Sequence, residues 1–278
     1  MFADCPEFLS ERDIALYWEH GYLAFENCLS IDEVEKAHAA ITELVNEDDP
    51  DYIVQFEPNY IADSKNDPEK YLRKLMYFKD HHPFTKFLHD EHEKIRMIRE
   101  NLLGSYPIAV QDTALVKAAK IGSEKPWHQD TAYFSVVPMD RVLGFWIALD
   151  DATIENGCMH VIDKGHKRGP IVHHHLPVIA PDSDGTLQQS DYLDCQIGKN
   201  KVGANEAKAI ELKAGGVLIF NGLLPHQTPP NVSDERRRAL QFHYRGKDTR
   251  QVNKEEYDDI FAESGEPASC SAAVDREK

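Results

Sequence analysis

The spacing of apolar residues changes near Pro107, and this change limits the folds that the chain can adopt. Before that point, apolar residues recur every three or four positions, as in 31–45, where Val34, Ala37 and Ile41 share one stripe of a helix. After it, short extended segments follow one another and are separated by turns. Helices followed by strands predict an α+β fold whose strands form a sandwich or jelly roll.

The first hundred residues are predicted to form a helical scaffold. Ser10 and Ser30 each begin a helix with a capping arrangement, and Gly21 ends the first of these helices. The expected elements are helices over 11–20, 31–45 and 83–103, a strand over 22–25, and 71–75 as a further part of the scaffold. Two polar stretches, 46–67 and 177–208, are expected to be long loops around the mouth of the barrel.

The remainder is predicted to supply the strands. The segment 141–150 is an almost continuous apolar run, typical of a strand buried on both faces. In 109–117 the alternation places Gln111, Thr113, Leu115 and Lys117 on one face. Further strands are expected over 159–162, 211–220 and 238–244, and the tail from about 263 to 278 is expected to be frayed.

Composition excludes several classes of partner. The 278 residues carry 31 basic and 48 acidic side chains, a net charge of -17, which argues against binding to nucleic acid or to an anionic membrane surface. Five cysteines without paired spacing suggest neither a disulfide framework nor a zinc site, so a reduced, cytoplasmic protein is expected. No signal segment or membrane-length apolar run is seen, and no linker or repeat divides 1–278, which predicts a single domain.

The triplet His128-Gln129-Asp130 lies in a stretch that is predicted to be extended. Alternate side chains of a strand share a face, so His128 and Asp130 would project together. With one further histidine they would form the two-histidine, one-carboxylate set of non-haem Fe(II) oxygenases, although a surface histidine paired with an aspartate is an alternative. A similar triplet at His89 lies in a predicted helix, where positions i and i+2 face apart, and is interpreted as a solvated helix face.

His226 is the candidate for the third ligand. It follows a predicted buried strand and stands among prolines, which restrict the backbone and would hold a ligand rigidly. The run of three histidines that begins at His173 is interpreted as solvated, and His160 and His166 have no carboxylate at strand spacing.

Several motifs, in this order along the chain, resemble the phytanoyl-CoA dioxygenase family of Fe(II)- and 2-oxoglutarate-dependent oxygenases. They are Gly21-Tyr22-Leu23, Trp127-His128-Gln129-Asp130, Glu155-Asn156-Gly157-Cys158, Gly165-His166-Lys167, and His226 followed by Arg236-Arg237-Arg238. The likeness covers a core of about 10–245. It implies a double-stranded β-helix, which is a jelly roll with N-terminal helices packed against the sheet.

The resemblance also implies the site residues. Iron would be bound by His128, Asp130 and His226, and the distal carboxylate of 2-oxoglutarate by Arg237, eleven places after His226. A guanidinium group suits this role because it holds a carboxylate through two parallel charge-assisted bonds. Strand alternation would turn the neighbouring arginines to the opposite face. Further co-substrate contacts implied by the resemblance are Thr228, Trp146, Thr113 and Lys74.

The activity that the resemblance implies is that of a dioxygenase using Fe(II), 2-oxoglutarate and O2. Such an enzyme hydroxylates, or otherwise oxidises, an unactivated C–H bond of a small-molecule substrate and releases succinate and CO2. Asp130 favours hydroxylation over halogenation, because halogenating relatives lack this carboxylate. Two alternatives remain, namely a jelly-roll metal oxygenase that does not use 2-oxoglutarate and a catalytically silent jelly-roll binding protein.

Overall fold

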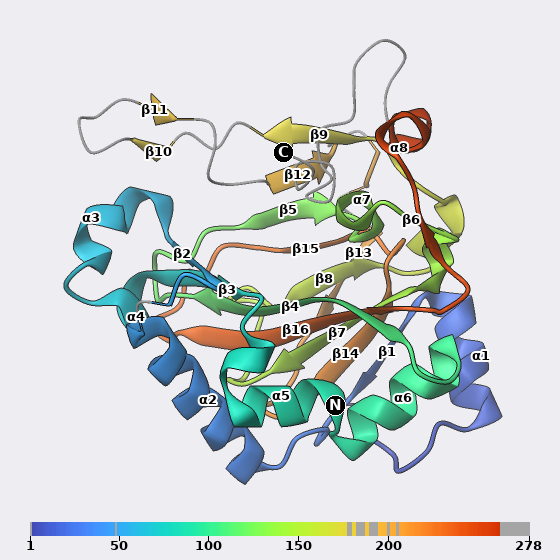
Figure 1. Cartoon of the computed structure of the whole chain (residues 1–278), viewed down its shortest axis with the longest axis horizontal. Coiled ribbons are helices and arrows are strands. Elements are labelled where there is room, and N and C mark those ends of the chain that lie inside the picture. The colour runs from blue at the N-terminus through green and yellow to red at the C-terminus, as the bar shows by residue number, and fades with distance from the viewer. Residues whose placement is uncertain are drawn as a thin grey trace.

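Two antiparallel sheets face each other in the computed structural model, and helices cover the outer face of the larger sheet (Figure 1). The structure describes residues 2–47, 49–176, 180–181, 187–188, 194–198, 201–203 and 206–261. The larger sheet has the order β1 (Tyr22–Phe25), β14 (Val217–Asn221), β7 (Val142–Ala148), β16 (Arg237–Arg245), β4 (Ile108–Lys117), β3 (Leu72–Met76) and β2 (Ile53–Phe56). The smaller sheet has the order β13 (Ala207–Ile210), β8 (Met159–Ile162), β15 (His226–Thr228) and β5 (Lys125–His128). The predicted α+β jelly roll is therefore confirmed.

Short strand pairs and helices complete the molecule. The pairs are β9 (His173–Leu176) with β12 (Asp194–Ile197), β10 (Ala180–Pro181) with β11 (Leu187–Gln188), and β6 (Val136–Val137) with β17 (Arg250–Gln251). The α-helices are α1 (Glu11–His20), α2 (Ile31–Asn46), α3 (Ile61–Ser64), α4 (Pro68–Tyr71), α5 (Pro83–Asp90), α6 (Glu93–Leu103), α7 (Thr131–Phe134) and α8 (Lys254–Phe261). The 3-10 turns are η1 (Pro58–Tyr60), η2 (Lys79–His81), η3 (Met139–Arg141) and η4 (Gly165–Arg168).

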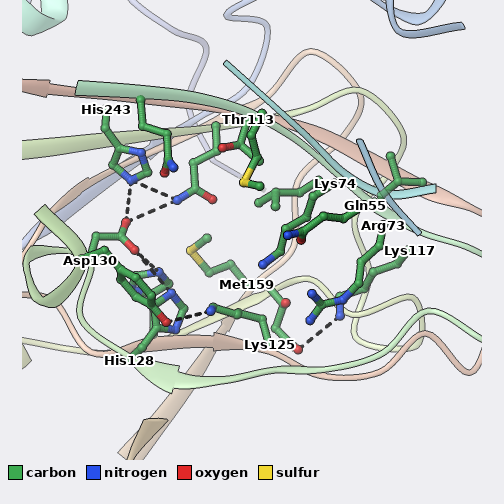
Figure 2. Close-up of a pocket in the computed structure, with 18 of the residues that line it drawn as sticks. Gln55, Arg73, Lys74, Thr113, Lys117, Lys125, His128, Asp130, Met159 and His243 are labelled. Atoms are coloured by element: carbon green, nitrogen blue, oxygen red, sulfur yellow. Dashed lines mark hydrogen bonds and ion pairs between the residues drawn. The ribbon is translucent and has the colours of Figure 1, made fainter. Parts of the chain in front are cut away.

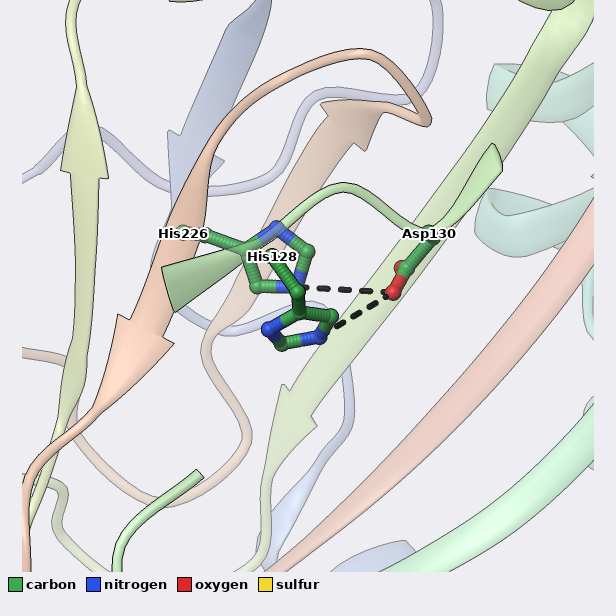
Figure 3. Close-up of side chains that lie close together, drawn as sticks. All are labelled: His128, Asp130 and His226. Atoms are coloured by element: carbon green, nitrogen blue, oxygen red, sulfur yellow. Dashed lines mark ion pairs between the residues drawn. The ribbon is translucent and has the colours of Figure 1, made fainter. Parts of the chain in front are cut away.

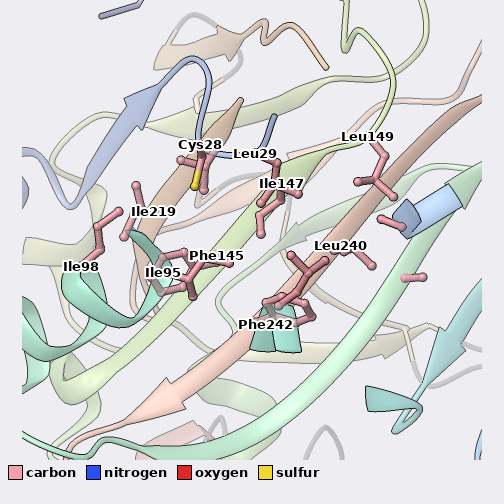
Figure 4. Close-up of a cluster of buried hydrophobic side chains, with 14 of the residues drawn as sticks. Cys28, Leu29, Ile95, Ile98, Phe145, Ile147, Leu149, Ile219, Leu240 and Phe242 are labelled. Atoms are coloured by element: carbon pink, nitrogen blue, oxygen red, sulfur yellow. The ribbon is translucent and has the colours of Figure 1, made fainter. Parts of the chain in front are cut away.

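Strand β7 is buried on both faces, which explains its continuous apolar sequence. Phe145 and Ile147 point outward and pack with helix residues such as Ile95 and Ile98 in the main hydrophobic core (Figure 4). Trp146 belongs to the second core between the two sheets. Alternate side chains of β7 therefore point to opposite faces of the sheet. One face packs against the helices, and the other faces the smaller sheet.

The helix starts follow the predicted capping chemistry. Ser10 and Ser30 each accept a hydrogen bond from the backbone N–H three residues on, and the carboxylates of Asp13 and Glu33 accept one from the backbone N–H of the capping serine. Gly21 ends α1 at a φ of 86°, in the left-handed region that glycine adopts without strain. These caps set where α1 and α2 meet the outer sheet face.

The prediction of one helix over 83–103 is wrong, because the chain forms α5 and α6 with a break between them. The Arg99 guanidinium donates to the carbonyls of His89 and Asp90, each at 2.7 Å, and so satisfies the carbonyl end of α5 from outside that helix. His89 is only 1% exposed and packs its ring against Phe242 and Tyr244. It is a core histidine and not part of a solvated helix face.

Two further segments depart from the sequence expectation. Residues 71–75, assigned to the helical scaffold, mostly form β3, because pairing with β2 and β4 on either side satisfies its backbone and buries Leu72 and Leu75. The stretch 46–67, expected to be a loop, contains β2, η1 and α3. Strand pairing outweighs the local pattern at β2 and β3.

The C-terminal part also differs from expectation. Regular structure continues beyond 244 through β17 and α8, whose buried Tyr257 and Phe261 pack against Leu223. Cys195 is disulfide-bonded, so the expectation of reduced cysteines is wrong at this position, whereas Cys5, Cys28 and Cys158 are free and buried. The predicted frayed tail and most of the 177–208 loop lie outside the described residues. Within the described part of the chain, no helix has the length and apolar character needed to cross a membrane.

Candidate active site

Three side chains on the smaller sheet and the turn that follows β5 converge at one point (Figure 3). His128 is the last residue of β5, and His226, the first of β15, is its direct partner across the strand pair. The expectation that Asp130 shares a strand face with His128 is wrong. The strand ends at His128, and Asp130 has helical backbone angles at the start of α7, which turn its carboxylate back toward the two imidazoles.

The geometry of these three residues suits a metal ion. Asp130 Oδ1 lies 3.3 Å from His128 Nε2 and 3.6 Å from His226 Nε2. The Nδ1 atoms face backbone carbonyls, that of Pro126 at 2.7 Å and that of Leu224 at 2.9 Å. An Nδ1–H that donates to a carbonyl leaves the Nε2 lone pair directed at the point between the three side chains. One nitrogen from each histidine and one carboxylate oxygen, all within 4.8 Å of one another, could therefore hold a metal.

Burial sets the protonation of this triad. It lowers the pKa of His128 to about 3, with help from His226 and Lys125, and it lowers the pKa of His226 as well. Burial by itself would raise the pKa of Asp130, but the charges of His226 and His243 and hydrogen bonds outweigh it and hold this pKa well below its usual range. Neutral imidazoles beside an ionised carboxylate are the forms in which these groups bind a metal.

The second oxygen of Asp130 is held by residues that the sequence analysis missed. His243 Nε2 lies 2.7 Å from Asp130 Oδ2, and Gln241 Nε2 lies 3.3 Å from the same oxygen. Both side chains are buried and come from the inward face of β16, the strand that begins with Arg237. Gln241 and His243 lie four and six residues after Arg237, so all three side chains point to the same face of β16. This even spacing is a signal by which the sequence could have identified them as site residues. They fix the carboxylate so that Oδ1 faces the histidines.

Gln129, between the two ligand candidates, anchors the turn. Its backbone N–H donates to His173 Nε2 at 2.8 Å, and its side-chain amide donates to the carbonyl of Leu223 at 2.7 Å. Its side-chain oxygen accepts from the N–H of Ile171 at 2.8 Å. His173 is 4% exposed, so the interpretation of this histidine as solvated is wrong. It serves to position the His128 turn.

The triad opens into a cavity of about 310 Å³ between the two sheets (Figure 2). His128 and Asp130 lie on one side of this cavity, and Lys74 and Lys117 lie on the other. Of the predicted co-substrate residues, the cavity is lined by Lys74, Thr113, Thr228 and Arg237. Trp146 is fully buried and does not line it. Its ring instead lies beneath Arg237, with the guanidinium carbon 5.3 Å from the ring centroid.

Arg237 is a buried cation on the cavity wall. It is 1% exposed, and among the described residues it forms no ion pair and its Nε has no hydrogen-bond partner. Burial lowers its pKa to about 10, so the guanidinium is charged at neutral pH. As strand alternation predicts, its neighbours point elsewhere, because Arg236 pairs with Glu69 at 3.0 Å and Arg238 with Asp150 at 2.8 Å. A buried guanidinium without an anion in the described structure fits a ligand carboxylate.

The fold and the site define a structural class. A jelly roll that carries two histidines and one carboxylate beside an internal cavity is the architecture of the Fe(II)- and 2-oxoglutarate-dependent oxygenases. Residues 17–239 match the family described as phytanoyl-CoA dioxygenase (PhyH), and the chain belongs to this family.

Comparisons with individual proteins agree with this membership. Phytanoyl-CoA dioxygenase domain-containing protein 1 of Mus musculus is 27% identical over an alignment of 276 positions, and the alignment covers 84% of this chain and 89% of the mouse protein. EvdO2 from Micromonospora carbonacea var. aurantiaca, solved in complex with 2-oxoglutarate, has a TM-score of 0.60 at 24% identity, covering 88% of this chain and 93% of its own. EctD from S. alaskensis, solved with bound Fe, has a TM-score of 0.64 at 19% identity, covering 86% and 77% respectively.

Proposed function

We propose that the chain is an Fe(II)- and 2-oxoglutarate-dependent dioxygenase that hydroxylates, or otherwise oxidises, an unactivated C–H bond of a small molecule. The observation that carries the proposal is a single cavity lined both by a buried metal-binding triad and by a buried arginine that lacks an anionic partner among the described residues. Iron and a dicarboxylate are the two groups that would satisfy these two features together.

In this proposal His128, Asp130 and His226 would hold the iron beside the cavity, a ligand set typical of non-haem Fe(II) oxygenases. Bound iron, 2-oxoglutarate and O2 together supply the oxidation of the C–H bond, and 2-oxoglutarate leaves as succinate and CO2. The protein orients the reactants and limits access of water, and Phe134 and Met159 contribute apolar wall to the cavity beside the triad.

The co-substrate would lie between the triad and Arg237. Its distal carboxylate would receive parallel hydrogen bonds from Arg237, whose guanidinium is supported by the ring of Trp146. Thr228 lies two residues after His226 on the same cavity wall and offers a hydroxyl. Lys74 and Thr113 line the cavity from β3 and β4, where Lys74 is the cross-strand partner of Leu115.

The test is an anaerobic titration of the metal-free protein with Fe(II) and then 2-oxoglutarate, followed by the visible absorption band of the iron chelate. We expect the band in the wild type and its loss or strong weakening in Arg237→Ala and His226→Ala. Arg236→Ala and His160→Ala are the matched controls and should retain it, because Arg236 points away from the cavity and His160 does not line it.

The outcomes separate the alternatives. Bound iron without a band would favour a jelly-roll oxygenase that does not use 2-oxoglutarate. Absence of iron binding would favour a silent jelly-roll binding protein. A band in the wild type would justify a screen of small molecules scored by succinate release, in which a hydroxylated product is expected because Asp130 occupies the position that halogenating relatives leave to chloride.

A further inference from the structure

Lys117 faces Arg237 across the pairing of β4 with β16. The two residues are direct register partners in an antiparallel pair, so their side chains leave the sheet on the same face. Both line the cavity, and their exposed fractions are only 4% for Lys117 and 1% for Arg237. A second buried basic side chain therefore stands next to the arginine that the proposed function assigns to the co-substrate.

The surroundings of Lys117 are shaped to its side chain. A Cβ added at Gly157 would lie 3.0 Å from Lys117 Cδ and 3.2 Å from Lys117 Cε, so this glycine leaves room for the lysine side chain. Its ammonium group donates to the carbonyls of Ser123 and Thr228. An ammonium group has three donors, and these two carbonyls leave one for a ligand in the cavity.

The charged form of Lys117 is costly without an anion. Like charges directly opposite each other on a sheet repel, and burial removes the water that would screen them. Neither Lys117 nor Arg237 forms an ion pair with a residue in the described part of the chain. Burial, followed by the charges of Arg237 and Arg73, holds the pKa of Lys117 well below its ordinary value. An anion bound between the two cations would relieve the repulsion and favour the charged amine.

We propose that Lys117 is a second cationic contact for the distal carboxylate of the co-substrate and acts together with Arg237 to select a dicarboxylate. This inference rests on the proposed function, because it concerns the same co-substrate. It adds a residue to the carboxylate subsite and a role for Gly157, which leaves space beside the lysine side chain.

The experiment compares two oxo acids of equal length. 2-Oxoglutarate and 2-oxovalerate share the oxo acid group that would bind the metal and differ only at the far end, where a methyl group replaces the carboxylate. Their affinities are measured by anaerobic titration of the Fe(II)-loaded protein, and the ratio of the two dissociation constants reports recognition of the distal carboxylate. In Lys117→Gln, whose amide still donates to carbonyls but carries no charge, we expect this ratio to fall tenfold or more.

Lys117→Met provides a second variant of similar length without donors and should show the same fall. Lys120→Met is the matched control, because Lys120 lies three residues away, more than half exposed, where it pairs with Asp234 at 3.1 Å. A ratio unchanged from wild type in a folded Lys117 variant, even with a lowered melting temperature, would show that the lysine is only structural and would overturn the inference. If the wild type itself binds neither oxo acid, the proposed function fails, and this inference fails with it.

Discussion

Replacing His243 with phenylalanine tests whether the proposed iron site depends on the way Asp130 is held. Phenylalanine keeps a ring of similar size between Phe134 and Phe220 but removes the 2.7 Å hydrogen bond to Asp130 Oδ2. A hydrogen bond to a charged group contributes about 1.5–3 kcal/mol, which corresponds to a loss of metal affinity of roughly 10- to 100-fold. Gln241, at 3.3 Å, remains as a weaker donor to the same oxygen, so the lower half of that range is expected.

The measurement is the dissociation constant for Fe(II), or for Co(II) as an air-stable probe, obtained by titration of the metal-free protein. His160→Phe is the control, because His160 is half-buried on β8 and, within the described residues, would lose only its Nδ1 contact, 3.2 Å from the carbonyl of Cys158. Metal affinity of His243→Phe within twofold of wild type, in a variant that melts normally, would refute the role assigned to this histidine in orienting Asp130.

Three further outcomes are expected. Gly157→Ala and Gly104→Ala both place a side chain at positive φ, which costs about 1–3 kcal/mol in each variant. Of these two, only the new Cβ at Gly157 would meet a carbonyl, that of Pro229 at 2.3 Å. Urea unfolding should therefore show Gly157→Ala to be less stable than Gly104→Ala by at least about 1 kcal/mol. Burial lowers the pKa of His89 to about 4 from an unfolded value of 6.5, so the unfolded state binds more protons than the folded state between pH 4 and 6.5. The free energy of unfolding should therefore fall by about 3 kcal/mol as the pH drops through this window. His89→Phe should make the free energy of unfolding less dependent on pH in the same window. Chelation of the metal should lower the melting temperature, and re-addition of metal at 100 times its dissociation constant should restore about 2.7 kcal/mol; an unchanged melting temperature would contradict metal binding to the folded state.

Local physics accounts for the elements that the sequence predicts correctly. The apolar run in β7 and the capping boxes of α1 and α2 need only neighbours within a few residues, and these elements have nearly the predicted bounds. The alternation along β4 likewise places Thr113, Leu115 and Lys117 on one face, as predicted, and the structure shows that this face lines the cavity. Patterns of this kind are readable because periodicity and capping act over one or two turns.

The failures have a different cause. The break between α5 and α6 is accompanied by the binding of Arg99 to carbonyls at the end of α5, and β3 is a strand because it pairs with neighbours on both sides. Asp130 reaches His128 from a turn, and not from the strand, because Gln129 is anchored by distant segments. Contacts between residues far apart in sequence outweigh local preference in each of these places.

The sequence by itself determined the jelly-roll class and the candidate metal ligands His128, Asp130 and His226, because strand periodicity and a short motif are written in neighbouring residues. Only the tertiary structure decided which groups hold those ligands in place. The register of β16 against its neighbouring strands places Lys117 opposite Arg237. The packing of the two sheets brings His243 to Asp130. That register depends on hydrogen bonding and burial across the whole sheet, which no local stretch of sequence contains.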